Sequence, residues 1–101
     1  MRNDSVEKRG TPRINIDHPI QFRIKDCEDG GVAYLINKSA TGVLFAASHQ
    51  MEIGKIVILT MDGGVSWDND NYIIECEVVR HHFVNDMIFK YGMGCVIKQK
   101  Y

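Results

Sequence analysis

A two-residue alternation of apolar and polar side chains is the feature that most constrains the fold of this 101-residue chain. Ile74, Cys76 and Val78 alternate with Glu75 and Glu77, the pattern of a strand with one buried and one wet face. No window of ten or more residues combines a 3.6-residue period with helix-capping residues. The chain is therefore expected to be all-β.

Strand character appears in six segments that are separated by residues typical of turns. The six segments cover residues 14–24, 32–36, 43–46, 54–61, 72–78 and 92–98. Pro19 interrupts the first segment, where a bulge or an edge position is expected because proline has no backbone N–H. The pattern predicts a six-stranded antiparallel barrel or sandwich, and closure into a barrel would remove the strand edges that promote aggregation.

The N-terminal residues have a different character from the rest of the chain. Residues 1–12 are polar, contain Gly10 and Pro12, and show no hydrophobic period, so we expect an arm without regular structure. The barrel domain is expected to span residues 13–101, with no helix after its last strand. Residues 1–13 hold the cations Arg2, Lys8, Arg9 and Arg13 against two acidic residues, Asp4 and Glu7, so the arm and its junction with the barrel are locally basic.

Charge and hydropathy argue against several classes of protein. The net charge of −1 disfavours a partner such as a nucleic acid polymer, whose binding needs many Lys and Arg contacts. The longest apolar stretch, residues 56–59, is far shorter than the ~20 residues of a membrane-spanning helix. The N-terminus also lacks the apolar core of a signal peptide. A cytoplasmic location without membrane insertion is expected.

The cysteine pattern suggests neither a disulfide framework nor a metal site. The three cysteines, Cys27, Cys76 and Cys95, are odd in number and have no Cys-x-x-Cys spacing. We interpret all three as reduced thiols that pack as small apolar side chains.

Two short motifs carry the groups that could bind a ligand. Residues 9–13 read Arg-Gly-Thr-Pro-Arg, where Gly10 bends the chain and Pro12 stiffens it. Two guanidinium groups could therefore converge on one ligand. Residues 37–42 read Asn-Lys-Ser-Ala-Thr-Gly, a polar turn whose glycine allows close approach to the backbone. Arginine suits phosphate oxygens and the O6/N7 edge of guanine, and Asn and Ser can bond a base edge or a phosphate.

The order of these motifs, their separation by one hairpin and the surrounding barrel pattern resemble the PilZ domain family. That family carries RxxxR followed by (D/N)xSxxG. The resemblance extends from Arg9 to about Ile97 and includes the closing Gly-Met-Gly-Cys-Val-Ile segment at residues 92–97, which is similar to the last barrel strand of the family.

The resemblance implies a receptor for cyclic di-GMP. It assigns phosphate and guanine contacts to Arg9 and Arg13, with the pocket completed by Asn37, Ser39 and Gly42. Lys8 precedes the first motif, at a position that the family links to binding of one or two ligand molecules. Asn37 stands where aspartate is commoner, and its uncharged amide oxygen is expected to bind the guanine N1/N2 donors more weakly.

Signalling is expected to pass through a separate effector protein. Many members of the family are fused to an effector domain, which the expected arm and barrel do not include. The alternative is a barrel of the same family that has weak or no nucleotide affinity and serves as a protein-interaction module. A single-strand nucleic-acid binder would need aromatic residues interleaved with a basic groove.

We expect no catalytic site, no metal site and no cofactor among the other polar groups. His81 and His82 are adjacent on a strand, so they should point to opposite faces, and Asp68 and Asp70 are interpreted as an acidic turn. Glu75 and Glu77 are expected on a solvated face, and Ser39 with His49 lacks the Gly-x-Ser-x-Gly elbow of a hydrolase. Trp67 could be a lid over the barrel or an anchor for a partner.

Overall fold

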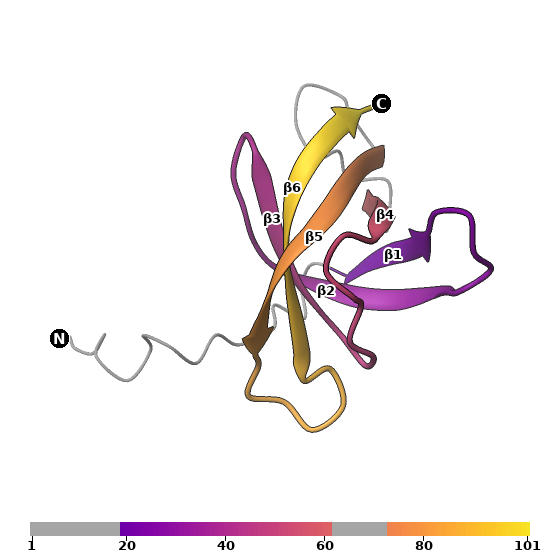
Figure 1. Ribbon diagram of the computed structural model, residues 1–101. Helices are drawn as coiled ribbons and strands as arrows, with labels where there is room; N and C mark the ends of the chain where they lie inside the picture. Colours follow the sequence, from indigo (N-terminus) through magenta and orange to yellow (C-terminus); the bar gives the residue numbers. More distant parts are fainter. Residues whose placement is uncertain (1–18, 62–72) are drawn as a thin grey trace, which may run out of the picture.

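Six strands form a closed antiparallel barrel in the computed structural model, which describes residues 19–61 and 73–101 (Figure 1). The strands are β1 (Pro19–Ile24), β2 (Gly30–Lys38), β3 (Gly42–Ala47), β4 (Ile56–Met61), β5 (Ile73–Phe83) and β6 (Tyr91–Lys100). Within the described ranges the chain contains no helix, hence none that could cross a membrane. The predicted all-β, six-stranded barrel is confirmed.

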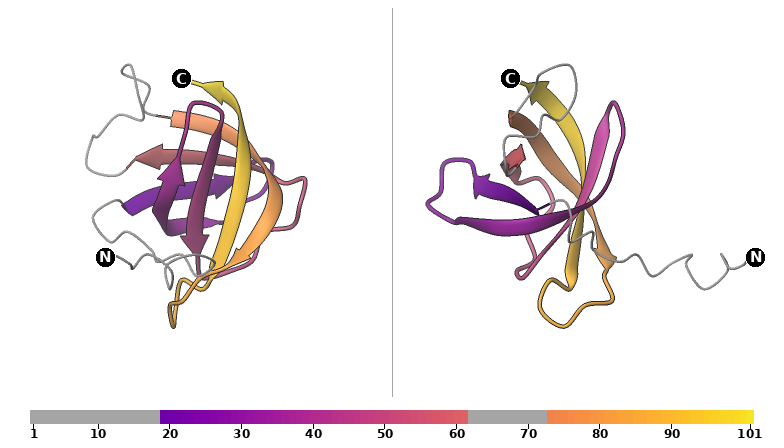
Figure 2. Two further views of the ribbon diagram at one scale, coloured as in Figure 1. Left: turned by 90° about the vertical axis from the view of Figure 1, so that its left-hand side faces the viewer. Right: turned by 180° about the vertical axis from the view of Figure 1, so that it is seen from behind.

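The strands follow the order β1-β2-β3-β6-β5-β4 around the barrel, and β4 closes it by pairing with β1. The last strand in the sequence, β6, therefore lies between β3 and β5, as Figure 2 shows. Each strand has a partner on both sides over at least part of its length, so the barrel formed by the described residues has no edge strand of the kind that open sheets have.

Side chains from alternating positions fill the barrel. The buried core includes Ile20, Leu35, Phe45, Val57, Leu59, Ile74, Val78 and Met93. On the outer side of β5, Glu75 pairs with Lys25 and Glu77 pairs with Lys98, each with a nitrogen–oxygen distance of 3.4 Å. The alternation in β5 therefore separates the core from a solvated face, as the sequence predicted.

Some strand boundaries predicted from the sequence need correction, and others cannot be compared because they fall outside the described residues. The fourth strand begins at Ile56 and not at Gly54, because Gly54 has a φ of 97° and belongs to the preceding turn. Residues 14–18, the whole arm and the loop that carries Trp67 lie outside the described residues.

The cysteine prediction is correct for two of the three residues. Cys76 and Cys95 are buried, whereas Cys27 is exposed between β1 and β2 and does not fill the core. The pKa of the Cys76 thiol is raised, most strongly by a hydrogen bond with Cys95 and next by burial. Cys76 therefore stays protonated inside the barrel.

Candidate functional site

The turn from β2 to β3 is organised by Ser39. Its hydroxyl oxygen accepts hydrogen bonds from the backbone N–H of Gly42 at 3.2 Å and of Thr41 at 3.4 Å. The backbone N–H of Ser39 also donates to the carbonyl of Gly42 at 2.8 Å. Because the oxygen is engaged with the turn, the hydroxyl proton is the part of Ser39 that can serve a ligand.

Gly42 packs closely against β6. A Cβ at this position would lie 3.2 Å from the carbonyl oxygen of Cys95. The turn is further fixed to β6 by a 2.8 Å hydrogen bond from Ile97 N–H to the Thr41 carbonyl. The backbone that a ligand would meet here is therefore held in place before any ligand arrives.

Two β-bulges turn polar side chains to the outside of the barrel. In β2 the register shifts between Leu35 and Asn37, and in β5 it shifts between Val78 and Arg80. Leu35 and Val78 are core residues, so a strict two-residue period would point Asn37 and Arg80 inward as well. The extra residue in each strand reverses this direction.

Asn37 and Arg80 lie in one transverse row of the sheet. Asn37 pairs with Leu44, Leu44 with Gly94, and Gly94 with Arg80. The row crosses three strand spacings, which corresponds to about 14 Å at the usual separation of strands. Residues that share a row share a face of the sheet, so an amide and a guanidinium group flank the same outer surface.

Arg80 lies across Gly94 on the neighbouring strand. The place of a Cβ on Gly94 is 2.9 Å from Cγ, 3.1 Å from Nε and 3.4 Å from Cζ of Arg80. Arg80 Nε donates a hydrogen bond of 3.0 Å to Nε2 of His82. This bond uses one of the five guanidinium N–H groups, so the side chain retains donors for an anion or a base edge.

These groups line a hollow of about 310 Å³ on the outer face of the barrel, which we call the turn hollow. It is lined by Asn37, Lys38, Ser39, Thr41, Gly42, Val43, Leu44, Arg80, His82, Cys95 and Val96. The structure thus brings together the predicted residues Asn37, Ser39 and Gly42. Lys38 and Arg80 supply two positive charges, which favour an anionic ligand.

Arg80 and His82 were not identified from the sequence as site residues. The signal that could have found them is Gly94, because a glycine inside a strand often marks the close approach of another group. The predicted residues Lys8, Arg9 and Arg13 lie outside the described residues, so their part in the site stays a prediction.

The remaining polar candidates have separate partners. Nε2 of His81 lies 2.6 Å from the carbonyl oxygen of Met51, whereas His82 bonds Arg80. His49 Nδ1 lies 3.1 Å from the hydroxyl of Ser48, whereas the Ser39 hydroxyl accepts from the backbone of its own turn. Across residues 19–61 and 73–101, no three or more His, Cys, Asp or Glu side chains gather in a group that could hold a metal ion.

Comparison with known proteins identifies the family of the chain. The PilZ domain family model matches residues 7–99, a range that includes both sequence motifs and all six strands except for the last residue of β6, Lys100. No curated protein and no solved structure gave a significant match. Since the family model covers nearly the whole chain, the chain belongs to the PilZ domain family.

Proposed function

We propose that the protein is a non-catalytic receptor that binds cyclic di-GMP in the turn hollow and signals to a partner protein. The observation that carries the proposal is the turn hollow itself, where Asn37, Ser39 and Gly42 of the second family motif meet Arg80. The PilZ family is known for binding this dinucleotide.

The chemistry of the hollow suits a cyclic dinucleotide, which presents two phosphates and two guanine bases. The Ser39 hydroxyl donates to a phosphate oxygen, and the Asn37 amide oxygen accepts from the N1/N2 edge of guanine. Lys38 and the guanidinium of Arg80 offset the phosphate charge. A planar guanidinium also stacks on a base, which contributes on the order of 0.5–2 kcal/mol.

The chain connectivity allows Arg9 and Arg13 to join this site. Pro19, where the described barrel begins, pairs with Tyr34 on β2, three residues before Asn37 and about 10 Å away along an extended strand. The six residues from Arg13 to Pro19 span up to about 20 Å when extended. Arg13 is therefore within reach of the turn hollow, and Arg9 lies one further short segment away.

The N-terminal arm, residues 1–12, orders over the ligand in this proposal. Its cations, including Lys8 and Arg9, meet opposite charge when the two phosphates arrive. Backbone amide relaxation of the arm, measured with and without cyclic di-GMP, tests this step. An arm whose relaxation is the same in both states would refute arm ordering even if the ligand binds.

Calorimetric titration of the whole chain with cyclic di-GMP, run beside GTP and cyclic AMP, tests the proposal. Arg9→Ala and Arg13→Ala should each weaken binding by about 1.5–3 kcal/mol, the value of a charge-assisted hydrogen bond. Arg23→Ala is the matched control, because Arg23 is an exposed cation on β1 that does not line the hollow. Absence of binding, or equal binding of all three nucleotides, would favour the alternative of a protein-interaction module.

A further inference from the structure

The connection between β5 and β6 exposes large apolar side chains. Phe83 is 68% exposed, Met87 93% and Ile88 64%, and the loop projects from one end of the barrel (Figure 1). Apolar side chains that are scattered singly over a surface are ordinary, but three exposed ones within six residues of one loop are a concentration of the kind that marks interaction sites.

This loop is held in a defined conformation by its own hydrogen bonds. The Asp86 carboxylate accepts from the backbone N–H of Ile88 at 3.0 Å and of Phe89 at 2.8 Å. The Phe89 ring packs edge-on against Tyr34 of β2, with centroids 4.8 Å apart. Because the loop is already ordered, a partner that binds Met87 and Ile88 has little conformational entropy to remove from it.

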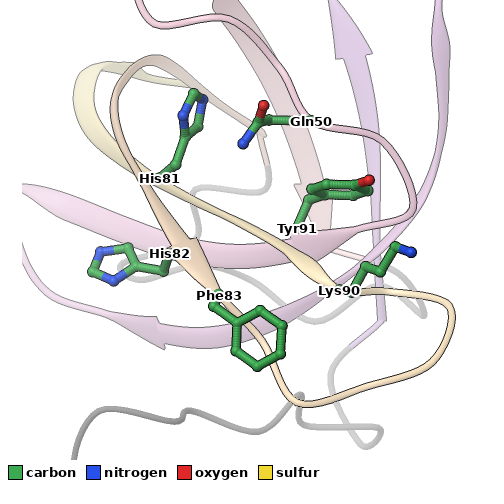
Figure 3. A pocket seen from close by; sticks show the side chains of 6 residues that line it. All are labelled: Gln50, His81, His82, Phe83, Lys90 and Tyr91. Atoms are coloured by element: carbon green, nitrogen blue, oxygen red, sulfur yellow. The ribbon is translucent and has the colours of Figure 1, made fainter.

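A concave surface lies directly beside the exposed side chains. This second hollow, of about 320 Å³, is lined by Gln50, His81, His82, Phe83, Lys90 and Tyr91, and Figure 3 shows Gln50 and His81 at one end and Phe83 at the other. Phe83 and Tyr91 are direct cross-strand partners, and both line the hollow. Such a cavity suits one apolar or aromatic anchor residue of a partner.

Two cations lie close to the second hollow. Lys90 Nζ lies 5.7 Å from the centre of the Tyr91 ring, and Arg80 is bonded to His82 at the other side of the hollow. The Asp86 carboxylate of the loop keeps its negative charge while it accepts from backbone N–H groups, but it does not line the hollow. A complementary partner therefore carries carboxylates around its apolar anchor.

We propose that Phe83, Met87, Ile88 and the hollow beside them form a docking surface for a partner protein segment with an apolar anchor flanked by Asp or Glu. We call this the hairpin surface. It supplies the partner chemistry of the proposed receptor function, and to that extent it rests on that function, but docking itself requires no nucleotide. His82 lines both hollows, so the partner would bind next to the ligand.

Selection from a library of random linear peptides displayed on phage, with the whole chain as bait, tests the proposal. Peptides that also bind the Met87→Ser/Ile88→Ser double variant are removed by counter-selection. The peptides retained should share an aromatic or aliphatic residue flanked by Asp or Glu. Added as synthetic peptides, they should shift the amide resonances of residues 83–91.

The affinity of these peptides should fall at least about tenfold in the double variant and in Lys90→Glu, as for hot-spot residues. Val32→Ser, 42% exposed on β2, and Lys55→Glu, an exposed lysine before β4, are matched controls that should leave binding unchanged. Circular dichroism of each variant should show that it retains the barrel.

Four results would overturn the proposal: no peptide enriched over the double variant, a basic or purely polar consensus, resonance shifts elsewhere on the barrel, or self-association that the double variant abolishes. The last result would mean that a second copy of the chain covers the surface. Titration with cyclic di-GMP separates the two proposals. The double variant should bind the nucleotide as the original chain does, and a chain that binds peptides but no nucleotide would refute only the receptor function.

Discussion

The Arg80 side chain occupies the space that a side chain on Gly94 would need, with Arg80 Cγ 2.9 Å from the place of the missing Cβ. The glycine on β6 and the arginine on β5 thus work as a pair. Because Gly94 has no side chain, the Arg80 side chain can lie across this position of β6. The hydrogen bond from Arg80 Nε to His82 Nε2 holds the guanidinium there. This relationship predicts that Gly94 matters for ligand binding without touching the ligand.

Arg80→Ala should weaken binding of cyclic di-GMP by about 1.5–3 kcal/mol if the guanidinium contacts the ligand. Arg80→Lys should recover part of the loss, because lysine keeps the charge but not the planar fork. Gly94→Ala should displace Arg80 and reduce affinity in the same direction. Calorimetric titration measures the affinities, and urea unfolding measures stability, where overpacking at Gly94 costs about 1–3 kcal/mol. Unchanged affinity in Arg80→Ala would make Arg80 a structural residue only.

The sequence predicted the part of the site that follows from local chemistry. The polar turn with Asn37, Ser39 and Gly42 lies between two strands as expected, because Ser and Gly favour such turns regardless of distant contacts. Arg80 was missed because the predicted strand ended at residue 78, whereas β5 continues to Phe83 and a bulge between Val78 and Arg80 turns the arginine outward. Nothing in the local sequence of β5 marks this bulge, since it depends on the pairing with β6.

The position of Cys27 shows a similar limit. Composition suggests burial, because cysteine is among the residues most often found in cores, but Cys27 falls in the turn between β1 and β2, where its side chain has no core to enter. Cys76 and Cys95 lie on strands with inward positions, so the two-residue period places them correctly.

The three thiols should therefore differ in reactivity. Cys27 is exposed and should react rapidly with a thiol reagent such as Ellman's reagent, whereas the buried Cys76 and Cys95 should react slowly until the chain unfolds. For Cys76 the raised pKa lowers the fraction of reactive thiolate further. Stopped-flow absorbance should show one rapid thiol, which Cys27→Ser removes. Rapid labelling of all three thiols under native conditions would contradict the burial of the other two.

Asn37→Asp should strengthen binding of cyclic di-GMP or leave it unchanged. A carboxylate accepts more strongly than an amide from the guanine edge, but it also repels a nearby phosphate. Titration of the variant beside Asn37→Ala separates the two effects, because alanine removes the acceptor without adding charge. A loss of more than about 1.5 kcal/mol in Asn37→Asp would instead show that the amide N–H₂ of Asn37 donates to the ligand.

The order of the hairpin surface should depend on pH through Asp86. A hydrogen bond from the backbone N–H of Phe89, and a second, weaker contribution from the backbone N–H of Ile88, hold the pKa of the Asp86 carboxyl below its ordinary value of 3.8. Because the folded state favours the carboxylate, the ionised Asp86 stabilises the folded loop fully above pH 3.8. This stabilisation is lost as the pH falls from 3.8 through the lower pKa that Asp86 has in the folded state. The Asp86 carboxyl ¹³C shift and the amide shifts of Ile88 and Phe89 should report one common midpoint below 3.8.

Two variants test whether the Asp86 carboxylate is responsible. Asp86→Asn keeps a neutral acceptor oxygen, so the amides of Ile88 and Phe89 should stay protected from hydrogen exchange without titrating. Asp86→Ala removes the acceptor and should expose both amides to exchange at neutral pH, while amides in the barrel core are unaffected because Asp86 lies outside the core. If Met87 and Ile88 dock a partner, Asp86→Ala should also weaken peptide binding, since a loosened loop must be ordered again on binding. A midpoint at or above 3.8 for Asp86, or protected amides in Asp86→Ala, would show that other contacts hold the loop in place.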